Sequence, residues 1–179
     1  MGEGEEGVTE PTPLTIRELL DAPKRVGRVL RTSGQDPEHS RLEIRVDAEV
    51  SGHFLVFVRV LRALPENFSF GLRYVAVDAG ETVLLRVNGD AHAHKNPDGS
   101  FFSATPHIHS FRGAMLLAPP RPEAQTKWAW PISINHIILS NAWAFFCAMT
   151  HLTSTKRIDA RIRKLRGAPT QLSLLPRSE

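Results

Sequence analysis

The chain has 179 residues, of which 41% are hydrophobic and 23% are charged, a balance typical of one globular domain with flanking tails. A single cysteine, Cys147, excludes an internal disulfide framework and a cysteine-rich zinc site. The longest apolar run, 137–149, is broken by Ser140 and Asn141 and is too short to span a bilayer. We therefore expect a cytoplasmic protein with no membrane partner.

The formal net charge of +3 is distributed unevenly along the chain. Residues 1–10 carry four acids and no base, whereas residues 156–166 carry six bases and one acid. Acidic, proline-containing termini rarely bury enough apolar surface to fold. We expect a disordered acidic leader at 1–13, a single domain at 14–166 and a tail at 167–179.

The chain between the leader and the tail predicts an α+β fold. A helix is expected at 15–20, ending before Pro23, and a loop at 32–40. Alternating apolar and polar residues then predict an antiparallel sheet of five to six strands. A helix without Gly or Pro follows at 134–152, so helices at both ends are expected to pack on the sheet. The strands are expected at 41–50, 54–61, 68–77, 81–88, 106–111 and 128–132.

The basic segment predicts an amphipathic C-terminal helix, because Ile158 and Ile162 recur at helical spacing. One interpretation is a solvated helix face. The other is a nucleic-acid-binding patch, because clustered Lys and Arg side chains release counterions from phosphates. The candidate nucleic-acid-binding residues are Arg157, Arg161, Arg163 and Lys164, together with Lys95.

Two His-x-His pairs lie within a short segment, His92 with His94 and His107 with His109. Side chains two residues apart on a strand point to the same face. The turn sequence Asn96–Gly99 lies between the pairs, so the chain is expected to fold back as a hairpin. A register with His94 opposite His107 places all four rings on one face.

Three interpretations of this cluster remain open. Neutral imidazoles are common zinc ligands, so His92, His94, His107 and His109 form a candidate metal site. Alternatively, His107 and His109 act as an acid–base pair assisted by His94, while Lys95 or Arg112 stabilises charge on a phosphodiester. In the third interpretation, the rings only hydrogen-bond loop carbonyls.

The order of motifs over residues 55–150 resembles an uncharacterised small bacterial domain family that also occurs in mobile elements. Members carry an Asn-Gly strand end, a histidine, NPDG, PHxH and KWA-x-P. The PHxH segment is also similar to TumE-type toxins, a resemblance that implies ribonuclease activity. Where the first family shows Arg-Glu-Gly, this chain has Arg112–Gly113 and lacks the glutamate. The matching residues here are 87–89, His94, 96–99, 106–109 and 127–131.

These observations favour a small, metal-independent, histidine-dependent endoribonuclease that needs no cofactor, associated with a toxin or defence system. Its catalytic residues are expected to be His94, His107, His109 and Arg112. RNA is the expected partner, and an acidic antitoxin is a possible second partner. The alternatives are a non-catalytic module that binds nucleic acid or protein through the basic helix, and a zinc site.

Overall fold

A computed structural model describes residues 13–32, 38–77, 80–90, 93–111, 127–133 and 139–165. His92, Arg112 and the proline-rich segment 118–123 lie outside the described residues, as do the predicted tail and all of the predicted leader except Pro13.

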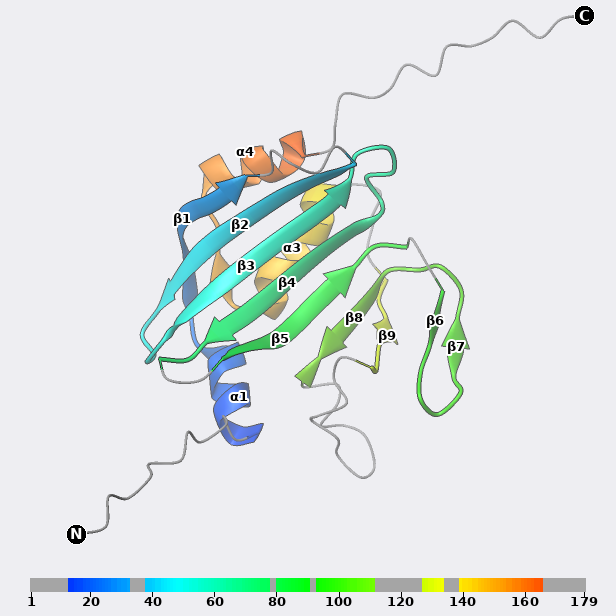
Figure 1. The fold of residues 1–179 in the computed structure, drawn as a ribbon, viewed down its shortest axis with the longest axis horizontal. Coiled ribbons are helices and arrows are strands. Elements are labelled where there is room, and N and C mark those ends of the chain that lie inside the picture. The colour runs from blue at the N-terminus through cyan, green and yellow to red at the C-terminus, as the bar shows by residue number, and fades with distance from the viewer. Residues whose placement is uncertain are drawn as a thin grey trace, which may run out of the picture.

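The fold is built on one eight-stranded sheet with the order β10-β1-β2-β3-β4-β5-β8-β9 (Figure 1). Neighbouring strands are antiparallel except for β1 and β10, which are parallel. A separate two-stranded hairpin, β6–β7, lies next to the edge of the sheet formed by β8 and β9 (Figure 1). The strands are β1 (Lys24–Thr32), β2 (His39–Ala48), β3 (His53–Leu61), β4 (Phe68–Val75), β5 (Glu81–Asn88), β6 (His94–Lys95), β7 (Phe101–Phe102), β8 (His107–Ser110), β9 (Trp130–Pro131) and β10 (Leu152–Thr153).

Helices cover one face of the sheet and leave the other open. The helices are α1 (Pro13–Asp21), α3 (Leu139–Met149) and α4 (Lys156–Lys164). Figure 1 shows α3 and α4 behind the sheet, and none of the described helices on the face toward the viewer. None of the described helices has the length and apolar character needed to cross a membrane.

The alternation of buried and more exposed residues along β2 explains why the two faces of the sheet differ. Leu42, Ile44 and Val46 are buried in the core, whereas the residues between them are exposed or half-buried on the open face. On the covered face, Phe70 of β4 packs edge-on against Trp143 of α3, with ring centroids 5.6 Å apart. Burial of this apolar side stabilises the fold. The open side carries mainly polar and charged groups, with a few apolar residues such as Phe57 among them.

The α+β class is confirmed, but the sheet is larger than predicted. The strand predicted at 81–88 is confirmed with the same bounds as β5, and the other predicted strands occur with shifted ends. Two strands of the large sheet, β1 and β10, were missed. Register shifts between Val26 and Val29 break the alternation of β1, and β10 has only two residues. The loop prediction was wrong at Thr32 and at His39–Ser40, which belong to strands.

The long helix predicted at 134–152 is shorter among the described residues, where α3 spans Leu139–Met149. His151 has a positive φ of 51°, a conformation that ends a helix. The chain then enters β10 at Leu152. The predicted basic helix is confirmed as α4, with Ile158 and Ile162 buried in the core.

A buried lysine closes one end of the fold. Lys24 is only 1% exposed, and its ammonium donates to the backbone carbonyls of Leu20, Ala22 and Thr150. It therefore joins the end of α1 to the residue that follows α3. The ammonium also lies 4.9 Å from the centroid of the Phe54 ring. Burial lowers the pKa of Lys24 to about 8.

Replacing this lysine should destabilise the fold. Lys24→Met leaves three carbonyl acceptors without their donor, two of them in buried hydrogen bonds, and we expect the free energy of unfolding to fall by about 3 kcal/mol. Urea unfolding measures the change. The control is Arg28→Met on the same strand, where the side chain is exposed, and it should change the free energy of unfolding by less than about 0.5 kcal/mol. Equal falls in the free energy of unfolding for Lys24→Met and Arg28→Met would contradict a stabilising role for the buried lysine.

The same lysine predicts a dependence of stability on pH. Its folded-state pKa of about 8 lies below the ordinary lysine pKa of 10.5. Between these values the unfolded chain holds more protons, so stability rises with pH. The stability of the wild type relative to Lys24→Met should increase by about 3 kcal/mol across this window. Urea unfolding of both proteins at pH 7.5 and pH 10.5 tests this prediction. A stability difference between wild type and Lys24→Met that stays constant or shrinks as the pH rises would refute it.

Candidate three-histidine site

Three histidines come together where the β6–β7 hairpin meets β8. His94 belongs to β6, whereas His107 and His109 belong to β8. One nitrogen from each ring lies within 4.8 Å of the others. The ring centroids are 5.2 to 5.6 Å apart. His107 and His109 are buried, and His94 is half-buried.

Strand alternation places the β8 pair on the open face of the sheet. His109 lies opposite Arg86 of β5, and His107 lies opposite Asn88. Directly opposed residues of antiparallel strands share a face. As predicted from their spacing, the two imidazoles therefore point the same way.

The predicted pairing of His94 with His107 was wrong. His94 lies opposite Phe102, and its ring stacks on that side chain at a centroid distance of 5.4 Å. The turn at Asn96–Gly99 closes the short β6–β7 hairpin instead, with Gly99 at a φ of 87°. Pairing stops at Phe102, before the chain reaches β8. The three rings meet because the hairpin packs against β8.

Asn96 anchors a third segment to this arrangement. Its side chain is buried, and its Oδ1 accepts from the Ala129 amide at 2.9 Å. Its Nδ2 donates to the Ala129 carbonyl at 3.1 Å. Pairing of Ile108 with Trp130 holds the same segment on β8. The NPDG, PHxH and KWA-x-P motifs therefore meet at one place.

Each ring has one nitrogen hydrogen-bonded to the backbone. A carbonyl oxygen only accepts, so the nitrogen facing it carries the hydrogen. In a neutral ring, the second nitrogen then offers a lone pair. The bonded pairs are His94 Nε2 with the Lys127 carbonyl (3.2 Å), His107 Nδ1 with the Thr105 carbonyl (2.9 Å) and His109 with the Trp128 backbone.

The second nitrogens differ in their surroundings. Nε2 of His107 accepts from the Asn88 side-chain amide at 3.0 Å. The side-chain oxygen of Asn88, Oδ1, in turn accepts a hydrogen bond from the Ser69 hydroxyl. Nδ1 of His109 is buried and has no hydrogen-bond partner among the described residues. A buried acceptor without a partner is costly, so it marks a place where a ligand would be favourable.

The surroundings keep His109 neutral. Burial lowers its pKa to about 3, and the nearby Arg86, His107 and His94 act in the same direction. At neutral pH the ring therefore carries no second hydrogen and does not act as a general acid. Neutral imidazole is, however, the form that binds a metal ion.

The cluster has the donor set of a zinc site. Three protein ligands are typical of catalytic zinc, and a ligating histidine usually donates its other N–H to a carbonyl or a carboxylate. A tetrahedral ion with Zn–N distances near 2.0 Å holds the nitrogens about 3.3 Å apart. The three nitrogens, which lie within 4.8 Å of one another, would therefore have to move closer together on binding the ion. A metal on Nε2 of His107 would replace the hydrogen bond from Asn88.

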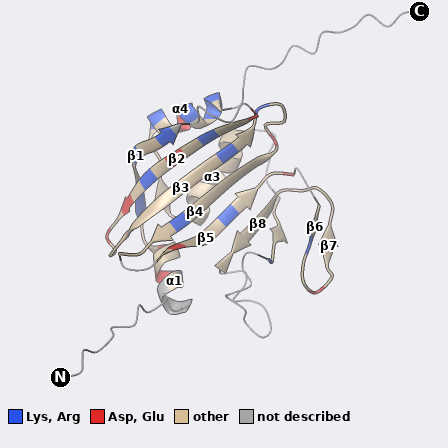
Figure 2. Ribbon diagram, viewed as in Figure 1, with Lys and Arg blue, Asp and Glu red and all other residues tan. Residues whose placement is uncertain are grey.

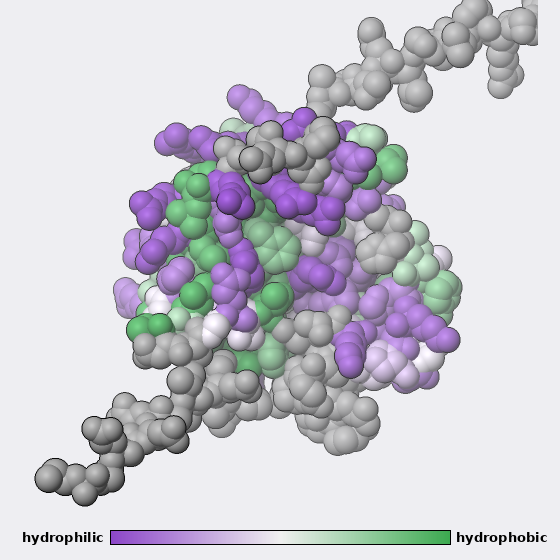
Figure 3. Space-filling model, viewed as in Figure 1, coloured by the Kyte–Doolittle hydropathy of each residue, from purple (hydrophilic) through white to green (hydrophobic). Residues whose placement is uncertain are grey.

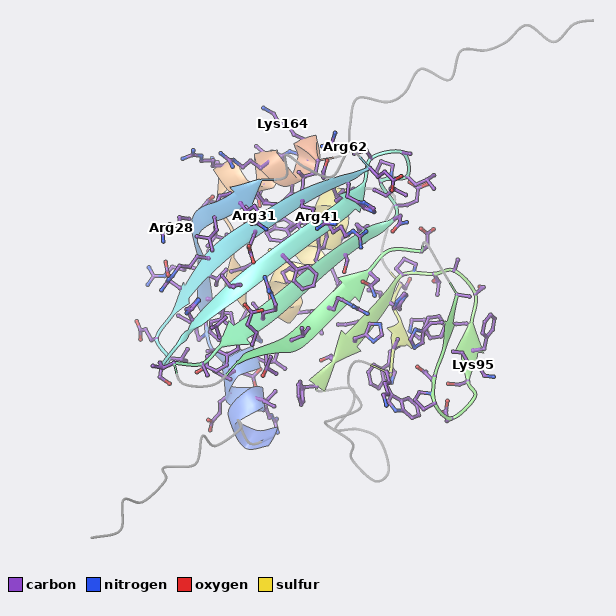
Figure 4. All side chains as sticks on the ribbon, in the orientation of Figure 1. Arg28, Arg31, Arg41, Arg62, Lys95 and Lys164 are labelled. Carbon is purple, nitrogen blue, oxygen red and sulfur yellow. The ribbon has the colours of Figure 1, made fainter. Side chains whose placement is uncertain are left out.

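The other predicted site residues are not brought to this cluster. Lys95 is exposed and follows His94 on the strand, so its side chain points to the opposite side of the hairpin (Figure 4). The α4 residues lie beside β1 and β2 (Figure 1). At about 4.8 Å per strand, β1 and β8 are about 24 Å apart. These distant α4 residues are Arg157, Arg161, Arg163 and Lys164.

Sequence reasoning missed three residues of the site. Asn88 and Asn96 were read only as strand-end and turn residues, although each makes a buried side-chain hydrogen bond. Arg86 was not singled out. The period-2 pattern of 81–88 could have placed Arg86 and Asn88 on one face, but nothing local identifies their partners.

Comparison with known proteins identifies a family but no activity. Residues 14–154 match a family of unknown function, DUF6978, and the chain belongs to it. This match confirms the resemblance to an uncharacterised family and spans all three motifs of the site. No curated protein and no solved structure matches the chain.

The anchoring role of Asn96 predicts a loss of stability. Asn96→Ala removes two hydrogen bonds to Ala129, and we expect the free energy of unfolding to fall by about 2 kcal/mol. Ser100→Ala is the matched control, because Ser100 is exposed in the same turn and also bonds Asn96. Urea unfolding should show a change near 0.5 kcal/mol or less for this control. A larger fall in the free energy of unfolding for Ser100→Ala than for Asn96→Ala would contradict the anchoring role of Asn96.

Proposed function

We propose that the protein binds a divalent transition metal, zinc above all, through His94, His107 and His109, and that this centre hydrolyses phosphodiesters. One observation carries the proposal. Each ring makes a backbone hydrogen bond through one nitrogen, and one nitrogen from each of the three rings lies within a 4.8 Å cluster. Three such ligands leave a coordination position for water or substrate.

Arg86 supports an anionic substrate. It lies opposite His109, so its guanidinium adds positive charge beside the proposed metal. A phosphodiester carries the complementary charge, and arginine recognises phosphate oxygens well.

The burial of His109 favours metal binding over a metal-free mechanism in which His109 is the general acid. Two histidines that cleave RNA without metal need one protonated ring near neutral pH. Burial and neighbouring charges hold the pKa of His109 at about 3. The metal-independent ribonuclease remains the second candidate, because His94 is only half-buried and the PHxH segment is similar to TumE-type toxins.

Metal content tests the proposal. Protein purified without a histidine tag should contain about one zinc ion per chain by mass spectrometry. His94→Ala should lower the zinc affinity at least about 10-fold, because it removes the most accessible ligand. His53→Ala is the control, since His53 starts β3 outside the cluster. Folded wild-type protein that takes up no zinc, or a His94→Ala variant that keeps full affinity, would refute the metal site.

Activity separates the two candidates. RNA cleavage should stop in EDTA and return when zinc is added. Cleavage that continues in EDTA and is lost in His107→Ala would instead support the metal-independent ribonuclease. Circular dichroism of His107→Ala must show a folded chain, since His107 is fully buried.

A further inference from the structure

The open face of the sheet carries a line of polar and basic residues that ends at the histidines. Its members are directly opposed from strand to strand, so their side chains share this face. From β2 to β8 the line crosses four strand spacings, or about 19 Å. The members are Arg41, Arg59, Ser69, Asn88 and His107.

A second line runs beside it through Arg86. Arg31 lies opposite Glu43 on β2, and the line continues through Phe57 and Gly71 to Arg86 and His109. Figure 2 shows basic positions on β1 to β5, and Figure 4 labels Arg31 and Arg41 among them. Hydrophilic side chains are prominent on this face in the space-filling view (Figure 3). The acids here are partly neutralised, because Arg73 pairs with both Glu43 and Glu81.

A hollow of about 300 Å³ lies on these lines between β3 and β5. Two arginines, Arg59 and Arg86, contribute to its walls, and no acid does so among the described residues. Amide and hydroxyl groups complete the polar lining, from Asn67, Ser69 and Asn88. Because Asn88 also hydrogen-bonds His107, the hollow adjoins the histidine site.

Arg86 lacks a partner for one of its donors. Its Nε is buried and makes no hydrogen bond within the described part of the chain. Arg59 is exposed, and its guanidinium contacts the ring of His39 at the mouth of the hollow. An anion in the hollow would supply the missing acceptor and would balance two positive charges.

We infer that the open sheet face binds the phosphate backbone of single-stranded nucleic acid, with one phosphate between Arg59 and Arg86. Charge complementarity selects this occupant, since the arginines follow one another across the sheet as phosphates follow along a strand. A single strand is also flexible enough to follow these two lines of residues with its phosphates. This interface lies on the sheet and not on α4, where the sequence predicted it. Binding of nucleic acid to the sheet does not require a bound metal.

Binding of a fluorescent single-stranded RNA of about ten nucleotides tests the inference. The double variant Arg59→Gln/Arg86→Gln should weaken binding by at least about tenfold. It should lower the salt slope by no more than about 1.4, which is about 0.7 for each charge removed from a single-strand site. The matched control, Arg157→Gln/Lys164→Gln on α4, removes the same charge and should weaken binding less than about twofold. Because Arg86 is half-buried, Arg41→Gln/Arg59→Gln provides a second variant with two exposed side chains. It should also weaken binding.

Three results would overturn the inference. The first is loss of binding only in the α4 variant, which would return the interface to the basic helix. The second is equal weakening by all three variants, which would indicate a general effect of net charge. The third is inorganic phosphate competing at the same concentration as RNA phosphate, which would indicate a small-anion pocket.

The binding assay is run in EDTA and again with zinc, while zinc content is measured on the same variants. RNA binding in EDTA supports the sheet surface even if the protein takes up no zinc. Zinc uptake without RNA binding would support the metal centre and refute the nucleic-acid-binding surface. The two proposals can therefore fail separately.

Discussion

The site depends on the pair of hydrogen bonds between Asn96 and the backbone of Ala129. They hold the segment around Trp128 against the hairpin that carries His94. That segment supplies the backbone acceptors for His94 and for His109. Without it, two of the three rings would lose the contact that fixes which nitrogen offers a lone pair.

The two faces of the sheet carry different kinds of side chain. The covered face supplies the apolar core, with the ring of Phe70 against Trp143 and Phe146 of α3. Lys24 fastens the ends of α1 and α3 to this core through buried hydrogen bonds. The open face carries little apolar packing of that kind, so its positions accommodate arginines and the histidine pair. This division places the histidines and the hollow on the same surface.

The sequence predicted those parts of the structure that depend on local pattern. Alternation located β2 and β5, and the spacing of His107 and His109 placed both rings on one face. The same pattern failed at β1, where irregular register hides the alternation. It also failed for His94, which reaches the cluster by packing of a hairpin and not by pairing with β8. Contacts between segments that are distant in the chain, such as Asn96 with Ala129, leave no periodic signal.

The most direct test of the proposed three-histidine zinc centre is zinc-edge X-ray absorption on the full-length protein after loading with one equivalent of zinc. A three-histidine centre should give scattering from about three imidazole rings, with zinc–nitrogen distances near 2.0 Å. His94→Ala should lower the imidazole count by about one. A zinc ion surrounded only by water and carboxylate oxygens would contradict a three-histidine centre.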